Sequence, residues 1–590
     1  MRWKEGLPPH LIPTPIPVPG GKKKVEIQEY RKRFSSRKIE FAVKFGGWIG
    51  RGLWRSVRGI KDDQESAREL RRLFESMGAL WIKVGQLISL RTDVLTPAMC
   101  EELSKLQFRS VGFPWHQAKP ILEESFGRPV GEVFEWIDEM PMAAASISQV
   151  HRACLREGDK VVVKVQRPYV EEDLSRDLHI FELIISVFKR LGILTYLRWD
   201  SLLWELRQIL LEEVDYRFEA SNQRKMRKML ARQRIYAPRL IGHLSGKRVL
   251  VMEYVPGALM SDYLELYRSD RALLNEWMKE NNIDPERVGV RLFLSFFRQL
   301  MEENFFHADL HPGNILLLRD NRFCLIDFGS AGTIESNLLN VYVMSLSALG
   351  ERDFRRAVDY TLLMCEDLPP YGLDEAKGEM VRAYREWSAK SALKGINYHE
   401  KSIAAAGIAS GQVMGKYKIA ASWQFLKISR TWVTLDSSLS FLLADTNFVR
   451  LIQHYFRDRR RRERKSKEKL SAFKAVTGSL SEVLLLETTN LRRRTRQLDR
   501  AAGKAASVMA ISLSGMRNVL LLLMLMIVVL LIVHAFGYSL VPGIMLTLFA
   551  DIQNRWDLSV LDWLIVLVAA TLLWLRVGRI VRRLVAREVD

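Results

Sequence analysis

The chain has 590 residues, and its 89 Lys and Arg against 68 Asp and Glu give a formal net charge of +21 at pH 7. Hydrophobic residues make up 48% and charged residues 27%, a balance that excludes a disordered or collagen-like chain. The excess of positive charge suits an acidic partner, either nucleic acid or anionic membrane. No CxxC pair is present, which excludes a disulfide framework and a cysteine-rich zinc site. The four scattered cysteines are Cys100, Cys154, Cys324 and Cys365.

The first 140 residues predict an extended lead followed by helices. Residues 1–24 hold six prolines and end in two adjacent glycines followed by three consecutive lysines, the pattern of a flexible segment with no core to bury. Apolar and charged positions then alternate at helical spacing over 29–107. We expect a proline-rich lead and a basic helical segment over 1–60, and a helical extension over 61–140.

Short strands and a run of small residues follow. The β-branched runs in 130–168 predict strands, so the central part of the chain is expected to be α+β. Small side chains let backbone N–H groups approach an anion closely, as a glycine loop does in a nucleotide site. The same alanines fit ordinary close packing, so the pattern alone leaves both interpretations open. The run consists of Ala143, Ala144, Ala145 and Ser146.

Lys164 directly follows the apolar triplet at 161–163. A strand that is apolar on both faces buries most of the lysine side chain, and a buried ammonium requires a carboxylate or phosphate as partner. An edge position or a surface side chain is the alternative for a lone lysine.

The sequence HADLHPGN at 307–314 has the Asp-to-Asn spacing of the protein-kinase catalytic loop, with Asp309 and Asn314. In that chemistry the Asp handles the proton of the nucleophile and the Asn binds a metal ion. A short strand and then Asp327-Phe328-Gly329 follow, and an Asp at a strand end can chelate the magnesium that bridges phosphates. Together with a strand lysine, this order indicates a phosphate-handling site. A zinc site at the two histidines lacks a third ligand.

Residues 457–469 are a basic block, and helical patterning continues to about residue 517. A solvated helix face is the usual meaning of such a block, but beside apolar spans it would also attract acidic lipids, which is the interpretation we favour. A homodimer contact is one interpretation of residues 470–510. Because lipid explains the positive charge, we expect a lipid membrane and no nucleic acid as partner.

Two apolar runs predict a transmembrane hairpin over 518–576. Residues 519–536 carry no formal charge, and residues 560–575 form a shorter run with Asp562 near its start. A helix of about 20 apolar residues crosses a hydrocarbon core. Basic residues flank the pair, including a basic tail at 577–590, so the positive-inside rule predicts a membrane-anchored protein whose catalytic part and both termini are cytoplasmic.

These residues resemble the UbiB family of atypical, protein-kinase-like proteins, which act in ubiquinone biosynthesis. The resemblance covers about residues 60–450, and the apolar hairpin matches bacterial members, which implies the bacterial inner membrane. Two motifs are absent from ordinary kinases: the KxGQ motif at 83–86 and the ExD motif at 213–215. The alanine run stands in place of the glycine-rich loop.

The resemblance implies an α+β, two-lobed protein-kinase-like fold with an N-terminal helical extension and the C-terminal hairpin. The N-lobe would span 141–257, the C-lobe 258–456 and a basic helical linker 457–517. ATP or ADP and Mg²⁺ are the implied cofactors, with Asn314 and Asp327 as metal ligands.

The implied roles extend to both lobes and the extension. Lys164 and the alanine run would hold the phosphates, and Asp309 would position or deprotonate the acceptor. Spacing does not say whether Glu213 or Glu219 meets Lys164, and the resemblance selects Glu219. A regulatory group in which the extension covers the site is also implied. Its members are Lys83, Gln86, Glu213 and Asp215.

By resemblance, the expected activity is ATP hydrolysis or action on a lipid-like quinone precursor, in company with quinone-biosynthesis enzymes. One alternative is a true protein or small-molecule kinase, which needs an acceptor groove open to solvent. The other is a nucleotide-gated scaffold that organises membrane enzymes and turns over no substrate of its own.

Overall fold

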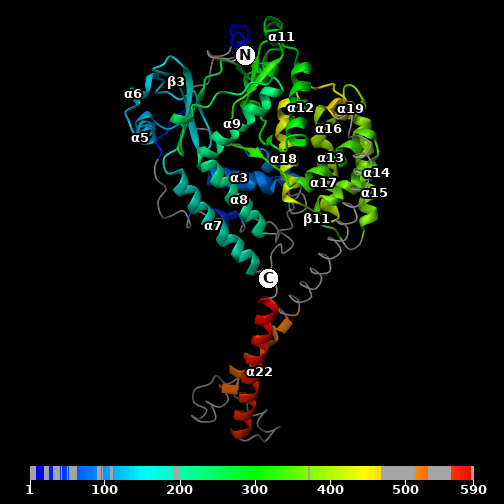
Figure 1. The fold of residues 1–590 in the computed structure, drawn as a ribbon. Helices are drawn as coiled ribbons and strands as arrows, with labels where there is room; N and C mark the ends of the chain where they lie inside the picture. Colours follow the sequence, from blue (N-terminus) through cyan, green and yellow to red (C-terminus); the bar gives the residue numbers. More distant parts are fainter. Residues whose placement is uncertain are drawn as a thin grey trace. The chain divides into compact units, whose positions relative to one another are not determined.

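The structure is a computed structural model. It describes residues 8–18, 25–30, 40, 43–48, 51, 63–89, 95, 97–106, 111–190, 199–369, 372–466 and 560–586, and short stretches within 509–528 (Figure 1). The chain divides into two compact units, Met1–Glu463 and Arg464–Asp590.

An antiparallel sheet forms the core of the N-lobe (Figure 1). Its strands are hydrogen-bonded in the order β1-β3-β4-β5, and β2 pairs with β3. Val161, Val163 and Val165 of β4 are almost fully buried among side chains of α5. Because strand side chains alternate between faces, Lys164 lies on the opposite face, toward α9. The elements are α5 (Trp115–Phe126), α6 (Val130–Val133), β1 (Phe134–Ile137), β2 (Ala143–Ala144), β3 (Ser148–Leu155), β4 (Lys160–Gln166), α9 (Tyr216–Arg232), η2 (Gly242–Leu244) and β5 (Val249–Glu253).

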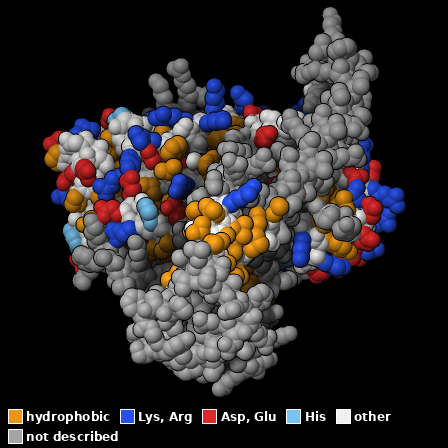
Figure 2. All heavy atoms as spheres, turned by 90° about the horizontal axis from the view of Figure 1, so that it is seen from below, with side chains coloured by type: hydrophobic (Ala, Val, Ile, Leu, Met, Phe, Trp, Pro, Cys, Tyr) orange, Lys and Arg blue, Asp and Glu red, His pale blue; other side chains and the backbone are white. Residues whose placement is uncertain are grey.

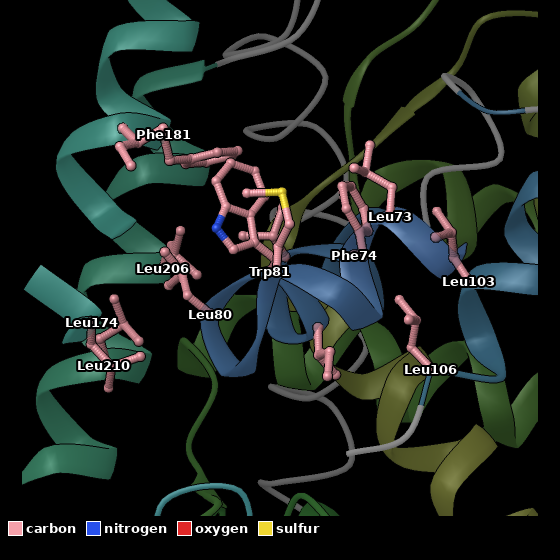
Figure 3. Close-up of a cluster of buried hydrophobic side chains, with 14 of the residues drawn as sticks. Leu73, Phe74, Leu80, Trp81, Leu103, Leu106, Leu174, Phe181, Leu206 and Leu210 are labelled. Carbon is pink, nitrogen blue, oxygen red and sulfur yellow. The ribbon is translucent and has the colours of Figure 1, made fainter. Parts of the chain in front are cut away.

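The helical extension packs on two later helices around Trp81. The Trp81 side chain is buried, and its ring centroid lies 5.9 Å from that of Phe181 in an edge-on arrangement. Figure 3 shows Trp81 among leucines and phenylalanines that come from both groups of helices. This apolar cluster joins the extension to the rest of the first unit. The helices are α2 (Asp63–Met77), α3 (Ala79–Ile88), α4 (Pro97–Ser104), α7 (Val170–Arg190) and α8 (Trp199–Val214).

The C-lobe begins with helices around an aromatic cluster and two small sheets. Phe293, Phe296 and Phe297 of α12 surround Trp432, with ring centroids 4.8–5.8 Å from it. The strand order β6-β8-β9 and the pair β7-β10 carry the loops of the candidate site. The elements are β6 (Ala258–Leu259), α10 (Met260–Ser269), α11 (Arg271–Glu280), α12 (Pro285–Met301), β7 (Phe306–His307), η3 (Pro312–Asn314), β8 (Ile315–Leu318), β9 (Arg322–Leu325) and β10 (Ala331–Gly332).

A group of helices completes the C-lobe, and most of them lie on the side of α12 away from the N-lobe (Figure 1). Asp353, Ser402 and Ser422 accept hydrogen bonds from backbone amides at the starts of three of these helices, as N-cap residues do. The elements are α13 (Ser336–Glu351), α14 (Phe354–Leu363), β11 (Cys365–Asp367), α15 (Leu373–Ala392), α16 (Tyr398–Lys401), α17 (Ile403–Lys416), β12 (Ala420–Ala421), α18 (Trp423–Leu439) and α19 (Phe448–Ser466).

Part of the proline-rich lead is docked, although its composition predicted a segment without a core. A short 3₁₀ helix, η1 (Pro9–Leu11), places Leu11 in an apolar cluster with Val255 and Leu318, where it is 3% exposed. An extended, proline-rich segment can bind a groove because its backbone groups remain available to the partner surface.

The predicted transmembrane hairpin is wrong. Among the residues that the structure describes, no helix is both long and apolar enough to cross a membrane. The sequence of α22 (Val560–Ala586) has Asp562 near its start and Arg576 past its middle, so its uncharged run falls short of the about 20 residues that a span needs. The membrane-anchored localisation, which depended on the hairpin, is wrong with it. Residues 529–559, in the region of the first predicted span, and the segment 467–508 lie outside the described residues.

Two arginines of the predicted lipid-binding basic block are paired within the first unit. Arg462 of α19 lies 2.5 Å from Glu302, and Arg460 lies 3.4 Å from Glu351. Acidic and basic side chains are likewise interspersed on the described surface at the two sides of Figure 2. Part of the positive charge is therefore balanced locally by acidic groups of the C-lobe.

The close packing of the extension makes Gly85 sensitive to substitution. A Cβ atom at Gly85 would lie 2.3 Å from Leu106 Cδ1 and 2.6 Å from Phe74 Cδ2. We expect Gly85→Ala to lower the free energy of unfolding by about 1–3 kcal/mol through overpacking. The control is Gly378→Ala in α15, where a Cβ meets nothing within 4 Å, and it should raise stability by about 0.5–1 kcal/mol. Urea denaturation of both variants measures this, and equal effects would contradict the packing argument.

A buried carboxyl group predicts a pH-dependent stability. Burial raises the pKa of Asp436 in α18 to about 7, although Tyr398 donates a 2.8 Å hydrogen bond to it. Since the folded protein then holds a proton that the unfolded chain releases above pH 3.8, this group lowers stability as pH rises toward 7. The total loss is on the order of 4 kcal/mol. The stability difference Asp436→Asn minus wild type should therefore increase from pH 5 to pH 8 in thermal melts, and parallel curves would refute the assignment.

Candidate functional site

Lys164 stands at the centre of the site. It lies opposite Val150 of β3 and Leu250 of β5 in the sheet, and its side chain is 12% exposed. Its Nζ atom donates to Glu219 Oε1 at 3.0 Å and Oε2 at 2.9 Å, and to Asp327 Oδ2 at 3.3 Å. Burial alone would lower the pKa of Lys164, but the two carboxylates outweigh burial and hold that pKa well above its usual value.

Helix α9 positions Glu219 beside Lys164. Asp215 caps the helix by accepting the Arg217 backbone amide at 3.0 Å, which fixes where the helix begins. Glu219 follows one turn later and is 3% exposed. Burial raises the pKa of Glu219 above its usual value even though Lys164 opposes this shift. Of the two glutamates that spacing left open, the one beside Lys164 is Glu219.

The Asp327-Phe328-Gly329 segment is held by two hydrogen bonds. Asp327 Oδ1 accepts the Gly329 amide at 2.9 Å, and Asn222 of α9 donates to the Phe328 carbonyl at 3.2 Å. The Asp327 side chain remains 38% exposed. Burial would raise the pKa of Asp327, but Lys164 and the Gly329 amide outweigh burial and hold that pKa below its usual range. An ionised, accessible carboxylate therefore lies beside a charged lysine.

Asp309 and Asn314 are held together in one loop. Asn314 Nδ2 donates to the Asp309 carbonyl at 3.0 Å, and the Ile326 amide donates to the Asn314 carbonyl at 3.2 Å. His307 Nδ1 accepts the Asp309 amide at 3.2 Å, and burial lowers the pKa of this histidine. A neutral imidazole is the form that can accept this bond, so His307 orders the loop without adding charge.

The alanine run forms a tight hairpin at the edge of the sheet. Ala143 and Ala144 make up β2 and pair with Val150 and Gln149 of β3. The Ala145 amide donates to the Ser148 carbonyl at 2.8 Å, which closes the turn. Ala143 and Ala145 are exposed, and Ala144 and Ser146 are partly exposed. The turn therefore presents small side chains to the outside, as an anion-binding loop requires.

The four residues assigned to regulation take part in three separate contacts. Lys83 of α3 lies 2.5 Å from Glu213 of α8, and both side chains are less than one-fifth exposed. Gln86 donates to the Leu106 carbonyl at 3.0 Å, within the extension. Asp215 is bonded to Arg217 as the cap of α9. The pair Lys83–Glu213 thus connects the extension to the residues just before α9.

The charges of the site fit a magnesium–phosphate ligand. With both carboxylates ionised, Lys164, Glu219 and Asp327 sum to one negative charge, which a divalent cation would neutralise. Asn314 uses its Nδ2 atom in the loop, so its Oδ1 atom remains as an oxygen ligand. The described residues contain no cluster of three or more acidic, His or Cys side chains suited to a metal. Mg²⁺ characteristically uses one or two protein oxygens together with substrate phosphates, so two ligands suffice.

Three supporting residues were missed by the sequence analysis. The Lys164 Nζ atom lies 5.3 Å from the ring centroid of Tyr216, a buried cation–π partner. Tyr216 is three residues before Glu219 on the same helix, and this spacing was the available signal. Asn222 anchors Phe328, and Arg167 donates to the Ala145 carbonyl at 2.9 Å. No local pattern marks these two contacts, because their partners are remote in sequence.

Comparisons with known proteins identify relatives of this chain. Residues 105–361 match the family model of the ABC1 atypical kinase-like domain. The chain is 31% identical over 326 residues to ACTIVITY OF BC1 COMPLEX KINASE 7 of Arabidopsis thaliana, covering 54% of this chain and 45% of that protein. It is 31% identical over 309 residues to the probable protein kinase UbiB of Tolumonas auensis, covering 51% and 55%.

Coverage differs among the relatives. The chain spans about half the length of the two just named. An uncharacterized protein of Synechocystis is 30% identical over 342 residues, with 56% of this chain and 81% of that protein covered. A solved structure, Rv3197 with erythromycin from Mycobacterium tuberculosis, aligns with a TM-score of 0.44 and 20% identity, over 70% of this chain and 97% of that one.

The buried ion pair of Lys164 and Glu219 predicts that replacing either residue lowers the free energy of unfolding, but by different amounts. Lys164→Met leaves two carboxylates facing each other, so we expect it to lower the free energy of unfolding by about 3–5 kcal/mol. Glu219→Gln leaves Lys164 with Asp327 and should cost less. The control, Lys377→Met, breaks an exposed pair with Asp359 and should cost at most about 1 kcal/mol. Urea denaturation gives the three values, and a cost for Glu219→Gln above that for Lys164→Met would contradict the central role of the lysine.

Proposed function

The chain belongs to the ABC1/AarF family of atypical kinase-like proteins, the family that includes UbiB, and we propose that it binds ATP with Mg²⁺ and cleaves the terminal phosphate in support of isoprenoid quinone synthesis. The observation that carries the proposal is the contact of Lys164 with both Glu219 and Asp327. This contact joins a strand of one lobe to the metal-binding loop of the other.

Each residue has a role that its position supports. Bound ATP–Mg²⁺ would supply the phosphoryl group, with Asn314 and Asp327 as the protein ligands of the metal. Lys164, kept charged by its carboxylate partners, would bind phosphate oxygens. Asp309, held by the Asn314 side chain, would orient or deprotonate the attacking hydroxyl group or water.

The extension supports a small acceptor in preference to a protein. Its helix α3 is tied by Lys83 to Glu213, six residues before the glutamate that meets Lys164. A helix held by an ion pair to a residue so near Glu219 in the chain would restrict the approach of a folded protein. A phenolic, lipid-like quinone precursor is the acceptor class we propose, or water when only hydrolysis occurs.

Phosphate release from ATP by the purified full chain tests this function. We expect Mg²⁺-dependent release that falls by at least about 100-fold in Asp327→Asn and in Asp309→Asn, because each removes a group used in the transition state. Nucleotide affinity should fall only in Asp327→Asn. The control is Asp359→Asn, an exposed carboxylate of α14 paired with Lys377, which should retain the wild-type rate.

Two outcomes would redirect the assignment. Tight Mg²⁺-dependent nucleotide binding without any release, with or without an added phenolic precursor, would favour a nucleotide-gated scaffold. Transfer of radiolabelled phosphate to a protein would identify a true protein kinase. Absence of nucleotide binding by the wild-type chain would refute the proposal altogether.

A further inference from the structure

The N-terminal part of the chain is attached to the C-lobe through residues 8–18. Leu11 is 3% exposed in a cluster with Leu316 and Leu318 of β8. The Thr14 amide donates to Asn281 Oδ1 at 2.8 Å, and Trp277 Nε1 donates to the Thr14 carbonyl at 3.0 Å. Both apolar and polar contacts therefore hold this first docked stretch.

A second docked stretch, residues 25–30, is attached to the N-lobe. Ile27 forms a parallel bridge with Gly112, and the Gln28 amide donates to the Gly112 carbonyl at 2.9 Å. Gly112 allows this approach because a Cβ atom there would lie 3.0 Å from Val25 Cγ1. Tyr30 exchanges two hydrogen bonds with the Gln117 side chain, at 3.1 and 3.0 Å.

Tyr30 connects the second docked stretch to the alanine run through Arg167. The Arg167 guanidinium lies 5.8 Å from the centroid of the Tyr30 ring, and the Tyr30 hydroxyl donates to Asp173 at 2.8 Å. The same guanidinium donates to the carbonyls of Ala145 and Val111. The Arg167 amide donates to the Ile147 carbonyl at 2.8 Å.

Arg167 is therefore bonded to the turn at two carbonyl groups, those of Ala145 and Ile147. Its side chain is 6% exposed, so water competes little for these bonds. Both docked stretches precede residues 105–361, the range matched by the family model.

We propose that Arg167 is a positioning residue for the alanine run, and that the two docked stretches hold Arg167 in place and so slow the release of nucleotide. The slowing of nucleotide release rests on the proposed function, whereas the positioning of the alanine run by Arg167 does not. Docking of residues 8–18 keeps residues 25–30 at a high effective concentration near the N-lobe, because the two stretches are close in the chain. A change in how residues 8–18 dock on the C-lobe would therefore alter how firmly Arg167 holds the alanine run.

Hydrogen exchange of the amides of residues 143–148 in the full chain, without nucleotide, tests the positioning. Tyr30→Ala and Arg167→Lys should speed this exchange by at least about fivefold, the lower range of couplings between sites. Leu11→Asp should give a smaller increase, and its control Leu393→Asp, at a position already 56% exposed, should give none. Exchange over Trp423–Leu439 is the internal reference and should stay constant. Unchanged exchange at 143–148 in both Tyr30→Ala and Arg167→Lys would overturn the proposal.

Release of a fluorescent ADP analogue and steady-state ATP turnover test whether the docked stretches slow the release of nucleotide. Tyr30→Ala should release nucleotide at least about fivefold faster and raise KM for ATP, with kcat preserved. Tyr30→Phe keeps the ring beside Arg167 and should fall between Tyr30→Ala and the wild type. Faster exchange with unchanged release and KM would refute control of nucleotide. If the wild-type chain binds no nucleotide, the proposed function fails while the exchange data still decide the role of Arg167.

Discussion

The contact of the buried Lys164 ammonium with two carboxylates is the constraint on which the site depends. An ammonium in a sheet that is apolar on its other face must find opposite charge, and it finds Glu219 on α9 and Asp327 after β9. These partners come from different lobes. The lysine therefore requires the two lobes, the start of α9 and the loop at Asp327 to be placed together, and an error in any one leaves a buried charge unpaired.

Residues 213–219 make three of the contacts that position the site. Glu213 meets Lys83 of the extension, Asp215 caps α9, and Glu219 meets Lys164. Gln166, two residues after Lys164, donates to the Val214 carbonyl at 2.7 Å, so the end of β4 and the end of α8 are also joined. The extension and the site are thus joined through the same few residues, and a shift of α8 would displace both.

The sequence predicted those parts of the site that depend on short spacings. Asp309 and Asn314 lie in one loop, and a strand carries Lys164 with its side chain away from the valine face. Contacts between remote residues, such as Arg167 with Ala145 and Leu11 with the C-lobe, left no local pattern. The hairpin prediction failed because it gave the apolar runs more weight than the charged residues that interrupt α22. The sheet begins before residue 141, where the N-lobe was predicted to start: β1 (Phe134–Ile137) lies within residues 130–168, whose β-branched runs predicted strands.

The loop that carries Asp309 is completed only late in synthesis. Ser438 of α18 donates a 2.7 Å hydrogen bond to the Leu310 carbonyl, 128 residues upstream. A ribosome adds about 5–20 residues per second, so about 6 to 26 s separate the synthesis of the two partners. Once Asp327 has been added, the nascent chain contains the residues of the site without their support from α18, which lies beyond residue 361 where the family match ends. The unit that folds is therefore longer than the unit that the family comparison recognises, and a chain interrupted before residue 438 would leave the ribosome with this loop unsupported.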